Sequence, residues 1–454
     1  MSENNIYKAL TLAILLATLL AACGTPAAKA PTDQPTATEA SGAGGSTSAC
    51  KDQTVRVWIL WGAENPAQLQ SLFDKFGTAT GSKVEVTAPV DDDKILPALT
   101  GSNPPDVLVL DAGDLVKSYA REGLVDELSQ AIQTGGIDLN DIYSAPMGMC
   151  KQGDKLWCLP WGSDLYALFW NKDLFEAAGL DPEQPPKTME QLAQFADKLT
   201  IKDANGEITQ IGFIPDLSWS HGDMYTRMMG GFWYNEDGTE LTANSQPVVD
   251  ALTWQQQFYK KYGADNVREF ASGFGEYSSP DHPFYAGKVA MMVEGEWQTG
   301  SNFISNFKPE LNYGVTAFPP PADHPERAGT VVAQGSVALI PSGATNKACS
   351  AELLSWMMSP EIVAEEMLAN ANLPTSKKAA QDPRFLENPK FKVFIDMMNN
   401  PNATYIITTP ISLEINDAMS AAEEQVLYKG ADPKEQLDAV QAEFAPKLKE
   451  ALQP

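Results

Sequence analysis

Residues 156–175, Leu-Trp-Cys-Leu-Pro-Trp-Gly-Ser-Asp-Leu-Tyr-Ala-Leu-Phe-Trp-Asn-Lys-Asp-Leu-Phe, decide the fold of this chain. An apolar run ends at Pro160-Trp161-Gly162, where proline cannot donate a backbone hydrogen bond and glycine leaves the backbone unusually free. A second apolar run, from Leu165 to Trp170, has the composition of a buried strand and ends before a short helix. This pattern predicts a strand that leaves one domain and enters another beside a cleft. The alternative is an ordinary bend within one sheet.

The composition of the whole chain limits its class and its partners. It has 454 residues, a net charge of −27, 43% apolar residues and 20% charged residues. This length allows two or three domains with a large core, and the composition is that of a globular protein. The negative charge argues against a nucleic-acid partner and against adsorption to an anionic membrane, because both need clustered Lys and Arg side chains.

The first 23 residues have the pattern of an export signal. Lys8 precedes an apolar run from Ala9 to Leu20, which is too short to span a bilayer but has the length of a signal-peptide core. The sequence Leu20-Ala21-Ala22-Cys23-Gly24 that follows is similar to the lipobox of bacterial lipoproteins. We therefore expect residues 1–22 to be a lipoprotein signal peptide, and Cys23 to carry the lipid that anchors the exported protein to the membrane. A plain secretory signal is the alternative.

Residues 23–49 contain mostly Pro, Ala, Thr, Ser and Gly, and we expect them to form a flexible linker after the lipidated cysteine. The other cysteines are Cys50, Cys150, Cys158 and Cys349, an even number that suits an oxidising compartment and allows three pairings. Cys150 and Cys158 flank Lys-Gln-Gly-Asp, a sequence typical of a tight turn. We therefore favour a disulfide across a hairpin there and a long-range disulfide between Cys50 and Cys349. With no Cys-x-x-Cys spacing and only three His residues, we expect no metal site and no cofactor.

From residue 54 the sequence alternates between strand-like and helix-like segments. Strands are predicted at 55–61, 83–87 and 105–110, with helical segments at 65–76 and 92–99 between them. This alternation predicts a parallel α/β sheet, in which ligands bind beyond the carboxyl ends of the strands. A second α/β unit is predicted from a helix that begins with a capping box at Thr188, a helix at 248–262 and a strand at 289–293. One helix is predicted over 350–368, and another begins at Asp432-Pro433.

Several motifs in a specific order then suggest a family. They are Pro105-Asp106-Val107, Leu159-Pro160 followed by 165–174, Gly287-Lys288-Val289-Ala290-Met291, Glu294-Gly295-Glu296-Trp297 and Asn312-Tyr313-Gly314-Val315. With the lipobox, they make the chain resemble the bacterial extracellular solute-binding proteins of ABC importers, in the sugar-binding branch typified by maltose-binding protein. The resemblance covers residues 54–452. It implies an α/β, two-lobed periplasmic-binding-protein fold of type II with a central ligand cleft.

The resemblance also implies how the chain is divided. Residues 50–158 with 328–370 would form lobe 1, and residues 163–318 with 374–454 would form lobe 2. Three inter-lobe crossings, near 157–163, 317–330 and 369–375, would act as the hinge. This division places Cys50 and Cys349 in one lobe, which favours their pairing.

Carried over motif by motif, the resemblance implies a ligand-binding cleft at the strand ends and crossings. Its expected residues are Trp61, Glu64, Asn65, Asp111, Gly113, Trp161, Ser163, Asp164, Tyr166, Trp219, His221, Glu294, Glu296, Trp297, Gln334, Gly335 and Ser336. Carboxylates and amides hydrogen-bond hydroxyl groups, and flat aromatic rings cover the apolar faces of a sugar. Lys and Arg are nearly absent from these segments, which argues against phosphate, sulfate or dicarboxylate ligands. For His221, a hydrogen bond within its own loop is the alternative to a ligand contact.

We expect a lipid-anchored receptor outside the cytoplasm that captures a sugar or oligosaccharide by hinge closure. Its expected partners are the sugar and the transmembrane subunits of an ABC permease, with no nucleic acid, no membrane contact except the anchor, and a monomeric state. We expect no enzymatic activity. The alternative is a secreted carbohydrate-active enzyme, a glycosidase that uses Glu294 and Glu296 as its acid and base.

Overall fold

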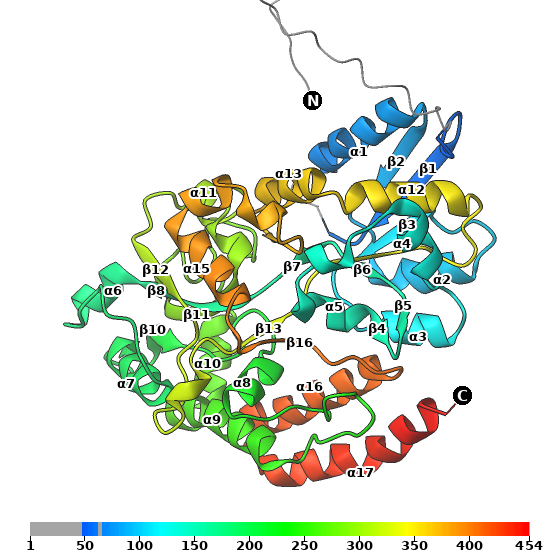
Figure 1. Cartoon of the computed structure of the whole chain (residues 1–454). Helices are drawn as coiled ribbons and strands as arrows, with labels where there is room; N and C mark the ends of the chain where they lie inside the picture. The colour runs from blue at the N-terminus through cyan, green and yellow to red at the C-terminus, as the bar shows by residue number, and fades with distance from the viewer. Residues whose placement is uncertain (1–47, 62–65, 454) are drawn as a thin grey trace, which may run out of the picture. The chain divides into compact units, whose positions relative to one another are not determined.

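The computed structural model describes residues 48–61 and 66–453, which are built on two five-stranded sheets (Figure 1). The first sheet has the order β2-β1-β3-β14-β6, with β1 (Thr54–Ile59), β2 (Lys83–Thr87), β3 (Val107–Leu110), β6 (Leu159–Pro160) and β14 (Val337–Leu339). The second has the order β12-β8-β11-β10-β9, with β8 (Tyr166–Asn171), β9 (Ile201–Lys202), β10 (Ile208–Phe213), β11 (Val289–Gly295) and β12 (Tyr313–Thr316). Strand β1 pairs in parallel with both β2 and β3, so the predicted parallel unit is confirmed.

Short and medium-length helices accompany the first sheet. They are α1 (Pro66–Thr80), α2 (Ile95–Thr100), α3 (Val116–Arg121), α4 (Ser129–Gly135), α5 (Ser144–Cys150), α12 (Lys347–Met357) and α13 (Pro360–Asn370). The single helix predicted over 350–368 is wrong, because the chain ends α12 and starts α13 at Ser359-Pro360. Proline has no backbone N–H to donate, so it is accommodated at the first position of a new helix.

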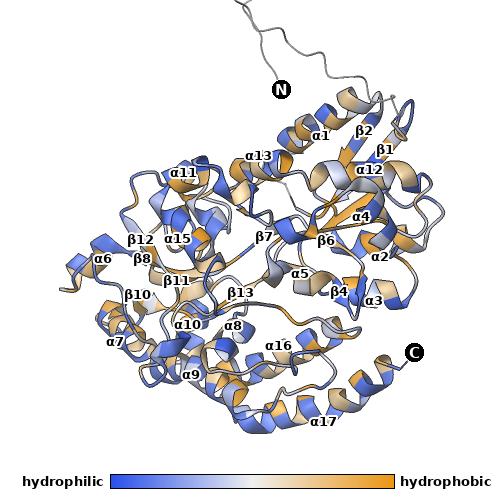
Figure 2. Cartoon of the chain, in the orientation of Figure 1, coloured by the Kyte–Doolittle hydropathy of each residue, from blue (hydrophilic) through white to orange (hydrophobic). Residues whose placement is uncertain are grey.

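The helices that accompany the second sheet range in length from four to 19 residues. They are α6 (Lys172–Ala177), α7 (Met189–Leu199), α8 (Gly222–Met228), α9 (Gln246–Tyr262), α10 (Ala264–Ala271), α11 (Ile304–Phe307), α14 (Arg384–Glu387), α15 (Pro389–Met398), α16 (Ser412–Lys429) and α17 (Pro433–Ala451). Thr188 caps α7 by accepting a hydrogen bond from the Gln191 N–H, and Asp432 caps α17 in the same way, so both predicted helix starts are confirmed. Figure 2 shows polar and apolar residues mixed along α9, α16 and α17.

Two apolar clusters form the core, and they meet across the strands of the second sheet. Along β8, Leu168 and Trp170 belong to one cluster, whereas Phe169 between them belongs to the other. This alternation follows from the two-residue period of a strand. The cluster that contains Phe169 also includes Phe394 of α15 and continues to the first sheet. One apolar cluster therefore reaches both sheets.

Backbone pairing joins the three segments that connect the sheets. Strand β7 (Gly162–Ser163) pairs with β15 (Leu373–Pro374), and Asp164 forms a bridge with Gln334. Strand β13 (Val331–Ala333) pairs in parallel with β16 (Ala403–Tyr405). Residues 162–164, 334 and 373–374 thus lie together between the sheets. The predicted crossings, the predicted lobe boundaries and their use as a hinge stay a prediction.

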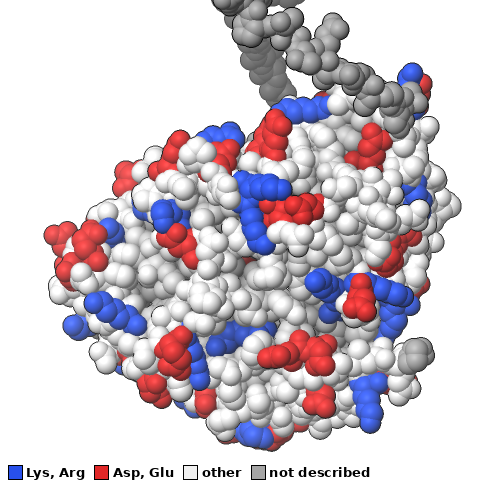
Figure 3. Space-filling view, viewed as in Figure 1, with Lys and Arg blue, Asp and Glu red and all other residues white. Residues whose placement is uncertain are grey.

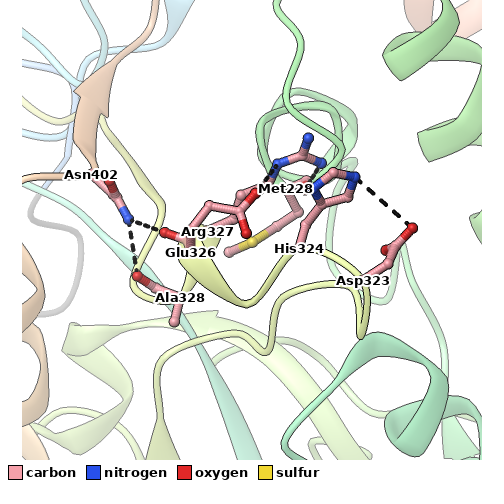
Figure 4. Close-up of polar contacts among 7 residues, drawn as sticks. All are labelled: Met228, Asp323, His324, Glu326, Arg327, Ala328 and Asn402. Atoms are coloured by element: carbon pink, nitrogen blue, oxygen red, sulfur yellow. Dashed lines mark hydrogen bonds and ion pairs between the residues drawn. The ribbon is translucent and has the colours of Figure 1, made fainter.

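The segment that connects β12 to β13 is held on both sides before it reaches β13 (Figure 4). Arg327 donates from Nη1 to the Met228 carbonyl, 3.1 Å away, at the end of α8. Asn402 donates from Nδ2 to the carbonyls of Glu326 and Ala328, at 2.9 and 3.1 Å. These contacts keep the segment beside α8 as far as Ala328.

Disulfides join Cys50 to Cys349 and Cys150 to Cys158, with Cα–Cα distances of 4.7 and 4.9 Å. The shorter link staples the hairpin of β4 (Lys151–Gln152) and β5 (Lys155–Leu156), whose turn contains Gly153 with a φ of +60°. The predicted signal peptide, the lipidated Cys23 and most of the linker lie outside the described residues.

Acidic and basic side chains are interspersed on the face drawn in Figure 3, although the chain as a whole carries a charge of −27. A search of the described helices found none with the length and apolarity needed to cross a membrane.

Candidate functional site

A cavity of about 380 Å³ opens where the ends of strands from both sheets and the connecting segments meet. We call it the tryptophan pocket, and its walls are Trp61, Asp111, Asp164, Trp219, Tyr277, Trp297, Asn302, Phe303, Ser336, Met367, Asn370 and Asn372. Its aromatic rings provide flat apolar surfaces, and its carboxylates and amides provide directed hydrogen-bonding groups. This combination is typical of sites for small polar molecules.

A second cavity of about 260 Å³ shares the Trp219 side chain with the first. We call it the arginine pocket, and its walls are Tyr166, Trp219, Ser220, His221, Gly222, Asp223, Met224, Arg227, Trp233, Tyr234, Val332, Gln334, Ile406, Ile407, Asn416 and Ser420. Its walls come from α8 and the segments on either side of it, from α16, from the segments around β13 and β16, and from Tyr166 of β8.

Three aromatic side chains stand between the two pockets. The Trp219 ring lies 6.1 Å from Trp297 and 6.2 Å from Tyr166, and the rings of Tyr166 and Trp297 are 5.9 Å apart and nearly perpendicular. Trp297 is further fixed because its Nε1 donates to the Tyr277 hydroxyl at 2.6 Å. A Cβ at Gly295 would lie only 2.2 Å from the Trp297 ring, so glycine is what lets this indole lie against the backbone.

A cluster of acidic and amide side chains lies at the junction of the connecting segments. Asn372 donates from Nδ2 to Asp164 Oδ1 at 2.9 Å and to Glu296 Oε1 at 3.4 Å, and the Leu165 N–H donates to the other Glu296 oxygen. Burial raises the pKa of Asp164 to about 6. Burial, followed by the nearby Asp164 charge, raises the pKa of Glu296 well above its ordinary value. The pair therefore retains a proton near neutral pH more readily than exposed carboxyls do.

Glu294 and Glu296 were expected at the ligand, and the structure places both behind the pocket walls. Each is fully buried, and neither lines either pocket. Glu294 accepts hydrogen bonds from the Ser218 and Tyr277 hydroxyls at 2.5 and 3.0 Å, and its burial raises its pKa to about 7. Because the same Tyr277 hydroxyl accepts a hydrogen bond from Trp297, Glu294 positions the Trp297 ring indirectly, through Tyr277.

Trp161 was expected in the cleft, and the structure places it in the core. Its side chain is 0% exposed, and its Nε1 donates to the Met357 carbonyl at 3.2 Å. The Trp61 ring stacks on it at 5.9 Å and separates it from the tryptophan pocket. Trp161 therefore supports Trp61 and does not present a face to a ligand.

Three more expected residues lie behind the pocket walls. Ser163 is fully buried and donates to the Gln334 carbonyl. A Cβ at Gly113 would lie 2.8 Å from the Met149 Cβ, so this glycine packs on α5. Gly335 has a φ of +128°, and a Cβ there would clash with the Gly162 carbonyl at 2.7 Å. These positions shape the junction through backbone packing.

The other described candidates reach the pockets. Trp61, Asp111, Asp164, Trp219, Trp297 and Ser336 line the tryptophan pocket, and Tyr166, Trp219, His221 and Gln334 line the arginine pocket. Glu64 and Asn65 lie outside the described residues. Desolvation in the pocket, followed by the Asp92 and Asp114 charges, raises the pKa of Asp111.

His221 has a neutral ring. It is 4% exposed, and burial lowers its pKa to about 3. Its ring packs edge-on against Tyr166 at 4.7 Å, and Tyr166 accepts a 2.5 Å hydrogen bond from Gln334. The arginine pocket therefore offers an uncharged imidazole to a ligand.

Within the described part of the chain, no group of three or more His, Cys, Asp or Glu side chains could hold a metal ion. The polar and aromatic groups of the site are indole, phenol and phenyl rings, hydroxyls, amides, carboxyls, one imidazole and one guanidinium.

Residues 71–393 match the model of a family described as bacterial extracellular solute-binding protein. The chain belongs to the bacterial extracellular solute-binding proteins. One relative of this solute-binding protein is the sn-glycerol-3-phosphate-binding periplasmic protein UgpB of Shigella dysenteriae, with 27% identity over 297 residues. The match covers 62% of this chain and 63% of that relative. UgpB of Pectobacterium atrosepticum is 29% identical over 257 residues, which cover 53% and 54% of the two chains.

Solved structures agree with the fold. The structure titled CpMnBP1 with mannotriose bound has a TM-score of 0.78 and 27% identity, and the match covers 86% of this chain and 99% of that one. UgpB from Mycobacterium tuberculosis in complex with glycerophosphocholine has a TM-score of 0.70 and 18% identity, over 87% and 99% of the two chains. The two-lobed type II fold of periplasmic solute-binding proteins is therefore the fold of this protein.

The sequence missed several pocket residues of this solute-binding protein. Asn370 and Asn372 were assigned only to a crossing, although both line the tryptophan pocket. Asp223 and Arg227 went unnoticed in the arginine pocket, although their spacing of four residues would place them on one face of a helix. That spacing was the available signal, but only the tertiary structure shows that the face borders a cavity.

Proposed function

We propose that this protein is the substrate-binding component of an ABC importer, and that it captures a neutral sugar or oligosaccharide outside the cytoplasm. The observation that carries the proposal is the tryptophan pocket, where three indoles and a tyrosine stand beside carboxylates and amides between two sheets. Such walls suit a ring with apolar faces and a rim of hydroxyl groups. The mannotriose and mannobiose named in the titles of two solved structures at 27% identity support this ligand class.

Ligand capture proceeds by closure of the two lobes about the connecting segments. The tryptophan pocket takes Trp61 and Asp111 from loops of the first sheet and Trp219 and Trp297 from loops of the second. A ligand that touches both groups binds the closed form more tightly and shifts the population toward it. Lys117 of α3, which accompanies the first sheet, also contacts the segment that follows β16, because its Nζ donates to the Thr408 carbonyl at 2.7 Å. The closed surface would then be recognised by the permease.

A binding role is favoured over glycoside hydrolysis. A glycosidase needs two carboxyl groups that face the scissile bond. Glu294 and Glu296 are buried, already hydrogen-bonded and absent from the walls of both pockets. We infer that they position the binding site and do not react with a sugar.

The proposal is tested with the purified protein and a panel of mannobiose, maltose, cellobiose, xylobiose and sn-glycerol 3-phosphate. Isothermal titration calorimetry should show binding of at least one disaccharide, small-angle X-ray scattering should show a decrease in the radius of gyration, and chromatography should show no hydrolysis. Hydrolysis that is lost in Glu294→Gln would favour the enzyme. Saturable binding of sn-glycerol 3-phosphate with no response to any sugar would contradict the proposed ligand class.

We also propose that the protein is exported and anchored through a lipid on Cys23, and that it works as a monomer with the membrane subunits of its importer. The lipobox-like sequence around Cys23 supports the anchor. Metabolic labelling with palmitate should label the wild-type protein in the membrane fraction. Cys23→Ser should abolish the label and release the protein, and unchanged labelling of Cys23→Ser would contradict the anchor.

A further inference from the structure

The arginine pocket contains a buried guanidinium whose hydrogen-bonding capacity is only partly used. Arg227 is 5% exposed, its Nη2 donates to the Tyr405 carbonyl at 3.2 Å, and its Cζ lies 3.4 Å from the centre of the Phe232 ring. Among the described residues, its Nη1 has no hydrogen-bond partner. Buried donors are normally satisfied, so an unpartnered guanidinium nitrogen beside a cavity indicates a ligand atom.

A carboxylate beside Arg227 is also incompletely used. Asp223 lies one helical turn earlier on α8, and its Oδ1 is 3.5 Å from Arg227 Nε, which makes an ion pair rather than a well-formed hydrogen bond. Its Oδ2 is buried and has no hydrogen-bond partner within the described part of the chain. One donor and one acceptor thus stand side by side in the wall of the same pocket.

The charge balance of this wall favours a neutral ligand over an anion. The positive charge of Arg227 is offset by Asp223, His221 is uncharged, and no other Arg or Lys lines the pocket among the described residues. A phosphate would face the Asp223 carboxylate. Of the two guanidinium nitrogens without a hydrogen-bond partner, Nε already pairs with that carboxylate at 3.5 Å, so only Nη1 is left for a phosphate and the fork that binds phosphate well is missing. Two neighbouring hydroxyl groups satisfy both partners, because one donates to Asp223 and the other accepts from Arg227.

We infer that the arginine pocket holds a further ring of a neutral oligosaccharide whose first ring lies in the tryptophan pocket, with Asp223 and Arg227 together binding one pair of neighbouring hydroxyls. The shared wall, Trp219, would lie against both rings. Asn416 and Ser420, one helical turn apart on α16, add polar groups to the wall of this pocket. The inference rests on the proposed function and specifies that the ligand has at least two rings.

Calorimetry with mannobiose, maltose, cellobiose and xylobiose, each compared with its own monosaccharide, tests the inference. We expect the best disaccharide to bind at least 100-fold more tightly than its monosaccharide. Asp223→Asn and Asn416→Leu should each weaken the disaccharide at least tenfold and change monosaccharide affinity by less than twofold. Asp417→Asn is the matched control, because this exposed neighbour on α16 does not line the arginine pocket and should change nothing.

The outcomes separate this inference from the proposed function. Equal affinity for monosaccharide and disaccharide, or variants that weaken both alike, would overturn the two-ring assignment and leave sugar binding intact. Saturable binding of sn-glycerol 3-phosphate that is lost in Arg227→Lys would overturn the neutral assignment. Failure to bind any sugar would contradict the proposed function and this inference with it. Arg227→Lys keeps the charge, and circular dichroism of each variant checks that it folds.

Discussion

The Asn372 side-chain amide donates to Asp164 Oδ1 across 2.9 Å, and so joins two connecting segments that are 208 residues apart in the sequence. The same nitrogen reaches Glu296, which follows β11 of the second sheet. A single amide therefore serves one fully buried carboxyl group, Glu296, and one half-buried carboxyl group, Asp164, at the place where the sheets are joined. Its loss would leave both without that donor, in an environment where an unpaired polar group is costly.

We expect Asn372→Leu to lower the free energy of unfolding by about 1–3 kcal/mol, because the carboxyl groups of Asp164 and Glu296 lose their shared donor. Urea denaturation followed by circular dichroism measures the change. Asn312→Leu is the control, since Asn312 is exposed and its amide donates to an exposed carboxylate, Asp173. A loss of stability as large in Asn312→Leu as in Asn372→Leu would contradict the importance of the junction.

Substitution of Trp161 should mainly lower stability, whereas substitution of Trp297 should mainly weaken ligand binding. Trp161→Ala removes a fully buried indole and should cost about 3–5 kcal/mol of unfolding free energy. Trp297→Ala removes a pocket wall and should weaken sugar binding about tenfold or more, equivalent to about 1.4 kcal/mol, with a smaller loss of stability. Thermal unfolding and calorimetry on both variants provide the comparison. A stable Trp161→Ala protein with weakened binding would restore Trp161 to the cleft.

Local sequence patterns predicted the elements of the fold well, because each depends on residues close in the chain. The parallel strands around Val57 follow from apolar runs separated by helix-length segments, and the helix starts at Thr188 and Asp432 follow from a capping side chain. The single helix over 350–368 failed because a proline that begins a helix was treated as a residue within one.

The site was predicted less completely, because burial depends on distant residues. Trp161 and Trp297 both stand next to strand ends and glycines, yet only the position of Met357, 196 residues away, and the Trp61 ring above it make Trp161 a core residue. Glu294 is likewise hidden by hydroxyls from Ser218 and Tyr277, which the sequence does not place beside it. Residue type identified candidates, and tertiary contacts decided which of them face the pockets.

The two disulfides should contribute very differently to stability. They link residues separated by 299 and by 8 positions, and a cross-link restricts the unfolded chain more when it closes a longer loop. Removing the Cys50–Cys349 link with a double alanine variant should cost about 6 kcal/mol, whereas removing Cys150–Cys158 should cost about 2.5 kcal/mol. All four sulfurs belong to fully buried residues, so each pair controls for the other. Equal losses in urea denaturation would contradict the loop-length account.

Glu366 should make stability decrease as the pH rises above 5. Its carboxyl is fully buried on α13 and accepts hydrogen bonds from Gln68 at 3.0 Å and Asn370 at 2.6 Å. Burial raises its pKa from the ordinary 4.5 to about 7. Between these two values the folded state holds a proton that the unfolded state has released, so its contribution is complete below pH 4.5 and is lost as the pH rises through 7.

Glu366→Gln keeps the shape and removes the titration, so it should flatten the pH dependence of unfolding free energy between pH 5 and pH 8 by up to about 3 kcal/mol. Its neighbour provides the comparison, because Glu365 pairs with Lys75 at the surface and its charge raises the Glu366 pKa less than burial does. Glu365→Gln should therefore reduce the slope much less than Glu366→Gln. Urea denaturation at closely spaced pH values measures the slope for all three proteins. A wild-type slope in Glu366→Gln would show that the pKa of this carboxyl does not differ between the folded and unfolded states. Because Asn370 donates to Glu366 and also lines the tryptophan pocket, we expect a bound sugar to shift the midpoint of the wild-type profile and to leave the flat profile of Glu366→Gln without such a transition.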